Sequence, residues 1–145
     1  ASAGAGCEVA PEIDRPTRPH VVYGAPRIDP RAFPADVGDR VFFDYDKATL
    51  RQDAKIVLGK QVEWLKQRAK LRIVVEGHAD ERGTREYNLA LGEKRAEAIK
   101  AYLVAKGLAA DRINTVSFGK ERPVALTADE AAWAQNRRGV IVLSE

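Results

Sequence analysis

VVEGHADERGTREYNLALGEKR, residues 74–95, contains the end of a strand, a polar loop and the start of a long helix. The strand is predicted at residues 71–76, because buried and exposed positions alternate there with the period of a pleated segment. Gly77 is predicted to end the strand and Gly83 to close the loop, since glycine adopts backbone angles closed to other residues. Thr84 is predicted to be the N-cap of the helix. Such a loop can curl around a ligand.

The helix has two adjacent faces with different characters. The face predicted to meet the core carries Leu89, Gly92, Ala96, Ile99 and Leu103. The second face carries Thr84, Asn88, Leu91, Arg95 and Ala98. Long helical side chains lean toward the N-terminus, so the guanidinium of Arg95 is predicted to point back to the loop and to share a space with Asp80. There the carboxylate would receive an ammonium group and the guanidinium would clamp a carboxylate in bidentate fashion. The pair predicts a site for an amino-acid-like ligand.

The composition is that of one globular domain with a tail. The chain has 145 residues, of which 45% are hydrophobic and 31% are charged. Its 24 basic and 21 acidic residues give a net charge of +3, and they are interspersed, which argues against a nucleic-acid surface. No apolar run approaches the ~20 residues that a membrane helix needs.

The first 38 residues are predicted to form a tether. They hold six of the seven prolines, and proline both removes backbone donors and keeps its predecessor extended. The segment also contains apolar residues, namely Val21, Val22, Tyr23 and Phe33. They either dock on the domain or bind a partner, and the sequence does not decide between these two interpretations. The run ASAGAGC resembles the end of a signal peptide before a lipidated cysteine, so Cys7 is a candidate for acylation. A free thiol in a flexible tail is the alternative.

Residues 39–145 are predicted to fold as an α+β domain, a two-layer α/β sandwich with helices on one face of a mixed sheet. Strands are predicted at residues 40–43, 113–118 and 139–143. A helix is predicted to begin at Thr49, which forms a capping-box pattern with Gln52. Lys106 and Gly107 are predicted to end the long helix. A short helix through Gln135 is predicted to be capped by Thr127 or Asp129.

An enzyme is the hypothesis that the sequence disfavours. The only histidines are His20 and His78, and His78 with Asp80 is an incomplete set for a catalytic metal, which needs about three protein ligands. His78 is instead predicted to bond to the loop backbone. Hydrolase and nucleotide-binding motifs are missing from the sequence. We therefore expect no catalytic residue, no metal and no cofactor, and turnover of a stem peptide is the observation that would favour a cell-wall hydrolase.

Four separated motifs in a fixed order resemble the OmpA-like peptidoglycan-binding domain, most closely in its peptidoglycan-associated lipoproteins. They are VFFDYDKATL from residue 41, GHADERGTREYNLALGEKRA from residue 77, SFGKERP from residue 117 and NRRGVIVL from residue 136. The resemblance implies an OmpA-like βαβαβ-type sheet. It also implies a set of residues that contact peptidoglycan: Phe43, Asp44, Asp80, Arg82, Thr84, Leu91 and Arg95.

The same resemblance implies a role in the cell envelope. Asp80 and Arg95 would hold the diaminopimelate of a peptidoglycan stem peptide, without catalysis. A lipid on Cys7 would anchor the chain to the periplasmic face of the outer membrane. The implied protein partners are TolB and the other Tol proteins of the Tol-Pal system. A periplasmic domain that binds a TolB-type protein at the same loop and helix is the alternative function.

Overall fold

Four strands form one mixed sheet in the computed structural model, which describes residues 32–144. β2 (Arg72–His78) pairs in parallel with β3 (Ile113–Gly119) and antiparallel with β4 (Arg138–Ser144). β1 (Arg40–Phe42) adds to the other side of β4, so the strand order is β1-β4-β2-β3. The predicted α+β class and the mixed sheet are confirmed.

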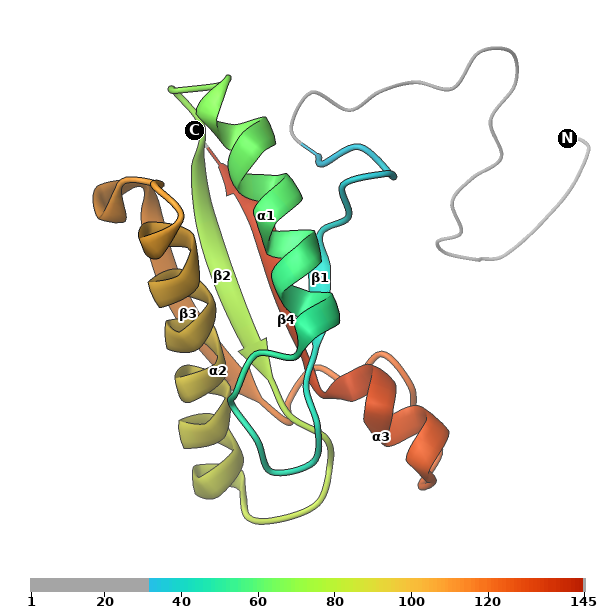
Figure 1. Ribbon diagram of the computed structural model, residues 1–145. Helices are drawn as coiled ribbons and strands as arrows, with labels where there is room; N and C mark the ends of the chain where they lie inside the picture. Colours follow the sequence, from blue (N-terminus) through green and yellow to red (C-terminus); the bar gives the residue numbers. More distant parts are fainter. Residues whose placement is uncertain (1–31, 145) are drawn as a thin grey trace, which may run out of the picture.

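Two long helices cover the same face of this sheet (Figure 1). They are α1 (Gln52–Lys66) and α2 (Arg85–Ala105). A short 3-10 helix, η1 (Ala110–Arg112), precedes β3, and α3 (Glu130–Asn136) lies beside the lower end of the sheet in Figure 1. The two-layer arrangement follows from the sequence, because the buried residues of each helix recur at the three- and four-residue steps of one helical face.

The core lies between the helices and the sheet. Side chains that are at most 2% exposed come from every long element, among them Leu58, Leu65, Ile73, Ile99 and Ile141. Burial of each such aliphatic side chain contributes about 1.5–3 kcal/mol. Alternate residues of β2 enter this core, as its pleated pattern predicts.

Two glycines let α2 lie directly on β2. A Cβ built on Gly77 would lie 1.7 Å from the carbonyl oxygen of Gly92, and one built on Gly92 would lie 2.3 Å from the hydroxyl of Ser117. No side chain fits at either position. This contact fixes the height of α2 above the sheet and thus the position of the residues that follow the strand.

Several boundaries agree with the sequence. The hydroxyl of Thr84 accepts a hydrogen bond from the backbone N–H of Tyr87 at 3.0 Å, so the N-cap of α2 is confirmed. Gly83, at the end of the loop, has a φ of 101°, and Gly107, after the end of α2, has a φ of 108°, both in the left-handed region that glycine favours. Asp129, rather than Thr127, is the N-cap of α3, and its side chain accepts from the N–H of Ala132.

Three expectations were wrong. β2 does not end at Gly77 but continues to His78, with a shift of register against β3 at that point. α1 begins at Gln52 rather than after Thr49, because Leu50 packs against the core and the chain stays extended through Arg51. Leu89 was placed on the core face of α2, yet it is 49% exposed, since it lies over β3, which is the edge strand of the sheet.

The chain before β1 lies against α1. The ring of Phe33 is 5.1 Å from that of Trp64, measured between centroids, so this one apolar residue of the predicted tether docks on the domain. Val21, Val22, Tyr23 and Cys7 lie outside the described residues. The division at residue 38 stays a prediction. Within residues 32–144, no helix has the length and the apolar composition that crossing a membrane requires.

Candidate functional site

The loops that follow β1 and β2 meet at one end of the sheet, beside the first turns of α2 (Figure 1). Between them is a cavity of about 60 Å³, which we call the Asp80–Arg95 cavity. It is lined by Tyr45, Asp46, Asp80, Arg82, Gly83, Tyr87, Asn88, Leu91 and Arg95. The prediction that Asp80 and Arg95 face one space is confirmed by this geometry.

Arg95 is the most unusual residue of the cavity, because its charged side chain is only 1% exposed. Its guanidinium donates to three backbone carbonyls: to Lys47 from Nε at 2.8 Å, to His78 from Nη1 at 2.8 Å, and to Asp44 from Nη2 at 3.1 Å. These bonds tie the loop after β1 to the end of β2. They use three of the five N–H groups of an arginine and leave one on each terminal nitrogen.

Among the described residues, the charge of Arg95 has no direct counter-ion. Within residues 32–144, no carboxylate oxygen comes within the 4.0 Å of an ion pair with its guanidinium. Burial is the main cause that lowers its pKa, to about 10, and the negative charge of Asp80 only partly opposes this effect. A buried cation held by carbonyls alone is costly, and an anion that enters the cavity would compensate it.

Asp80 is 4% exposed, and the neighbouring residue Arg82 holds its carboxylate. Oδ1 accepts from the backbone N–H of Arg82 at 3.0 Å and from its Nε at 3.3 Å, while Oδ2 accepts from Nη2 at 2.8 Å. Nη1 of Arg137 lies 3.6 Å from Oδ2. Burial by itself would raise the pKa of Asp80, but the hydrogen bonds and charge of Arg82, with the charge of Arg137, bring that pKa below its usual range.

Arg82 is fixed by two aromatic rings as well as by Asp80. Its guanidinium carbon lies 4.0 Å from the ring centroid of Tyr45 and 3.9 Å from that of Trp133. The indole N–H of Trp133 in turn donates to the carboxylate of Glu81 at 2.8 Å. Trp133 comes from α3, so this short helix also holds the Arg82 side chain in place.

The residues that the sequence assigned to the site divide into two groups. Asp80, Arg82, Leu91 and Arg95 line the cavity. Phe43, Asp44 and Thr84 do not line it: Phe43 is fully buried beneath Arg95, Asp44 pairs through its carboxylate with Arg51 at 3.4 Å, and Thr84 caps α2. These three support the cavity wall, and Cys7 lies outside the described residues.

The sequence did not assign Arg137 or Asn88 to the site, although Arg137 approaches Asp80 and Asn88 lines the cavity. Arg137 is 6% exposed and donates to the carbonyl of Phe43 at 2.9 Å and to Glu130 at 2.9 Å. Asn88 is 2% exposed, and its amide donates to the carbonyl of Arg82 at 2.8 Å, which holds the loop against α2. The only trace of Arg137 in the sequence is a pair of arginines placed directly before an apolar strand.

His78 is not bonded to the loop backbone as predicted. Its Nε2 lies 3.0 Å from the carboxylate of Glu76, its ring stacks on Phe118, and its Nδ1 has no hydrogen-bond partner among the described residues. Burial is the main cause that lowers its pKa from 6.5. The described part of the chain holds no cluster of three or more His, Cys, Asp or Glu side chains suited to a metal ion.

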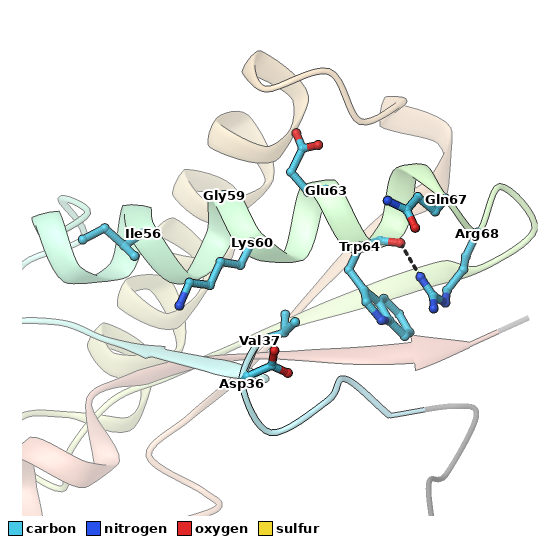
Figure 2. A pocket seen from close by; sticks show the side chains of 9 residues that line it. All are labelled: Asp36, Val37, Ile56, Gly59, Lys60, Glu63, Trp64, Gln67 and Arg68. Atoms are coloured by element: carbon cyan, nitrogen blue, oxygen red, sulfur yellow. Dashed lines mark hydrogen bonds between the residues drawn. The ribbon is translucent and has the colours of Figure 1, made fainter.

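A second and larger hollow of about 640 Å³ runs along α1, and we call it the α1 groove (Figure 2). It is lined by Asp36, Val37, Ile56, Gly59, Lys60, Glu63, Trp64, Gln67 and Arg68. Its charged side chains are exposed, and Arg68 donates to the carbonyl of Trp64 and lies over the Trp64 ring. The α1 groove is therefore large, but none of the charged side chains that line it is buried.

Known proteins resemble this chain over the whole region that builds the cavity. The model of the OmpA family matches residues 42–137. A peptidoglycan-associated lipoprotein of Mesorhizobium japonicum is 56% identical over 112 residues, which are 77% of this chain and 67% of that protein. One of Rhizobium meliloti is 53% identical over 111 residues, 77% of this chain and 63% of that protein. The chain thus spans about two thirds of the length of these curated relatives.

A solved structure has the same fold. The crystal structure of the peptidoglycan-associated lipoprotein from Burkholderia pseudomallei superposes with a TM-score of 0.72 at 44% sequence identity. The alignment covers 74% of this chain and 92% of that one. The family match over residues 42–137 includes the elements that carry Asp80 and Arg95.

Proposed function

This chain belongs to the OmpA family, and from that premise we propose that it binds peptidoglycan without catalysis, through the diaminopimelate of a stem peptide. The observation that carries the proposal is the buried guanidinium of Arg95, which is held by three carbonyls and faces a cavity that it shares with Asp80. The names of the two curated relatives described above include peptidoglycan, and this agrees with the proposal.

Diaminopimelate carries an ammonium and a carboxylate on the same carbon at the end of its side chain. In the proposed complex the carboxylate accepts from the two remaining N–H groups of Arg95, in the bidentate geometry that a guanidinium favours. The ammonium lies on Asp80. Leu91, which is 9% exposed, supplies an apolar wall for the methylene groups. The N-terminal end of α2 adds a positive potential that favours the carboxylate.

Binding rather than turnover fits the residues of the cavity. None of the nine residues that line it is a serine, cysteine or histidine. Its one buried carboxylate is neutralised by two guanidinium groups and has a lowered pKa, which makes it a poor general base. The site can hold a charged ligand, and it offers no activated nucleophile.

We further propose that the whole protein tethers the outer membrane to the cell wall as part of the Tol-Pal system. A lipid on Cys7 would hold residues 1–38 at the membrane, and the domain of residues 39–145 would hold the wall. Each buried methylene of an acyl chain contributes about 0.8 kcal/mol to such an anchor. Palmitate labelling in cells that is lost in Cys7→Ser is the expected result, and labelling that persists would contradict it.

TolB is the proposed protein partner, with the other Tol proteins as further partners. The exposed rings of Tyr45 and Tyr87, 56% and 52% exposed, lie at the cavity and suit a protein interface. A partner bound there would cover the cavity, so peptide and TolB would compete. Purified TolB is expected to bind the chain less tightly in the presence of saturating stem peptide. Unchanged affinity for TolB would show that TolB and the stem peptide bind to different surfaces.

Calorimetry with a diaminopimelate-containing stem peptide tests the binding proposal. Asp80→Ala and Arg95→Lys are each expected to weaken binding, because the first leaves a ligand charge unpaired and the second removes the bidentate fork. The control is Arg85→Gln, which removes the charge of a neighbouring arginine whose side chain is 75% exposed. Wild-type affinity in both cavity variants would refute the assignment, as would release of cleaved peptide over days of incubation.

A further inference from the structure

Both oxygens of the Asp80 carboxylate are occupied by the protein itself. Oδ1 accepts from the N–H and Nε of Arg82, and Oδ2 accepts from its Nη2 at 2.8 Å, with Arg137 at 3.6 Å. The place where a ligand ammonium would sit is therefore filled by the Arg82 side chain. The cavity beside it, at about 60 Å³, is itself lined by Arg82.

The side chain of Arg82 is less enclosed than that of Arg137. Its side chain is 30% exposed, against 7% for Arg137, and beyond Asp80 its guanidinium contacts the rings of Tyr45 and Trp133. Its backbone N–H would remain on Oδ1 when the side chain swings out. Asp80 would therefore keep its orientation after the guanidinium has gone.

We propose that the Arg82 guanidinium occupies the ammonium subsite of the Asp80–Arg95 cavity and must be displaced by the ligand, which makes Arg82 a specificity-determining residue that rejects ligands carrying only an amine. This inference rests on the proposed function. It assigns Arg82 the role of a competitor for Asp80, where the family resemblance implied a contact with peptidoglycan.

Ligands that carry only an amine are rejected because of the interactions that are lost and gained when a ligand displaces Arg82. An amine without a carboxylate replaces one cation on Asp80 by another, and the protein loses the fork and two ring contacts of Arg82. A ligand that also carries a carboxylate gains, in addition, the interaction of that carboxylate with the uncompensated charge of Arg95. Only the second exchange is favourable. Lysine has the side chain of diaminopimelate without its terminal carboxylate, so a lysine stem peptide is the matched probe.

The test titrates four forms of the full chain with the diaminopimelate stem peptide and with the same peptide carrying lysine. The forms are wild type, Arg82→Gln, Trp133→Leu and the control Arg85→Gln. Arg82→Gln is expected to bind the diaminopimelate peptide about tenfold more tightly than wild type does and to bring the lysine peptide into the measurable range. Trp133→Leu keeps the charge of Arg82 but removes one ring, and a tightening of about threefold is expected. Arg85→Gln is expected to stay within about twofold of wild type.

The outcomes separate this inference from the proposed function. Weaker or unchanged binding of the diaminopimelate peptide by Arg82→Gln, with a wild type that binds, would overturn the role of Arg82 and leave the proposed function standing. Equal tightening in Arg85→Gln would also overturn it, because the effect would then be one of net charge. No binding of either peptide by any form would overturn the proposed function and this inference together.

Discussion

The α1 groove and the Asp80–Arg95 cavity differ in size and in the state of their charges. The groove measures about 640 Å³ and the cavity about 60 Å³. In the groove, Glu63 has a side chain that is 75% exposed and pairs weakly with Lys66 at 3.7 Å. In the cavity, Arg95 is 1% exposed, and within residues 32–144 its guanidinium hydrogen-bonds to carbonyls alone. A solvated charge is satisfied by water, whereas a buried one is satisfied only by what the protein or a ligand provides.

The comparison teaches that volume is a poor guide to this site. A glycine in each region adds to the contrast. Gly77 underlies the cavity end of the sheet, where a Cβ would clash with the backbone of Gly92. Gly59 lies on α1 in the groove, where a Cβ would meet no atom within 4 Å. The first glycine is required by packing. The second leaves a hollow in the surface and makes the helix less stable than alanine would.

The largest effect is expected on the free energy of unfolding, when alanine replaces Gly77. Gly77→Ala forces the backbone of α2 away from β2, and it is expected to lower the free energy of unfolding by about 3 kcal/mol or more. Denaturant unfolding followed by circular dichroism measures this loss. A variant as stable as wild type would show that α2 can shift without cost, and the account of how Arg95 is positioned would then be wrong.

The next difference is expected in ligand affinity. Asp80→Ala is expected to cost at least about 2 kcal/mol of binding free energy for a diaminopimelate stem peptide. The double variant Lys60→Ala and Glu63→Ala removes two opposite charges from the α1 groove and is expected to bind within about twofold of wild type. Calorimetry of both under one buffer gives the contrast. The reverse ranking would make the groove the binding site.

A smaller effect is expected from His78, which is buried at the end of β2. Its pKa is lowered in the folded state, so below pH 6.5 the unfolded chain binds the proton more readily and stability falls as the pH falls. His78→Gln removes this proton uptake. The loss of unfolding free energy between pH 7 and about pH 5 is therefore expected to be smaller in the variant than in wild type. Equal losses would assign the acid sensitivity to other groups.

The smallest effect is expected at Gly59, where a substitution is expected to stabilise the fold rather than to destabilise it. Gly59→Ala is expected to raise the free energy of unfolding by about 0.5–1 kcal/mol, because alanine is the better helix former and its methyl group meets open space. Thermal unfolding measures the gain, and stem-peptide affinity is the control that should not change. A loss of stability would mean that the groove is packed more tightly than its geometry indicates.

Local patterns in the sequence predicted most of the fold. The alternation in β2, the cap at Thr84 and the glycine after α2 depend on neighbours in the chain, and each is confirmed. The expected start of α1 at Thr49 was wrong for the opposite reason: Leu50 packs into the core, and that tertiary contact outweighs a local cap. The exposure of Leu89 likewise depends on tertiary structure, because Leu89 lies over the edge strand β3.

The site was predictable only where one helix carries it. The direction of Arg95 follows from the geometry of α2, so its approach to Asp80 could be inferred from the sequence. The contacts of Trp133 with Arg82 and of Arg137 with Asp80 join residues more than 50 positions apart. No local pattern specifies such contacts. The displacement that we propose for Arg82 depends on them and became visible only in three dimensions.

The crystal structure of the full chain with a bound diaminopimelate stem peptide tests the central claim most directly. The account predicts the side-chain ammonium about 3 Å from the Asp80 carboxylate, the adjacent carboxylate in bidentate contact with Arg95, and the Arg82 side chain turned out of the cavity. A peptide seated in the α1 groove, or one that touches the loop while Arg95 keeps only its three carbonyl partners, would contradict it.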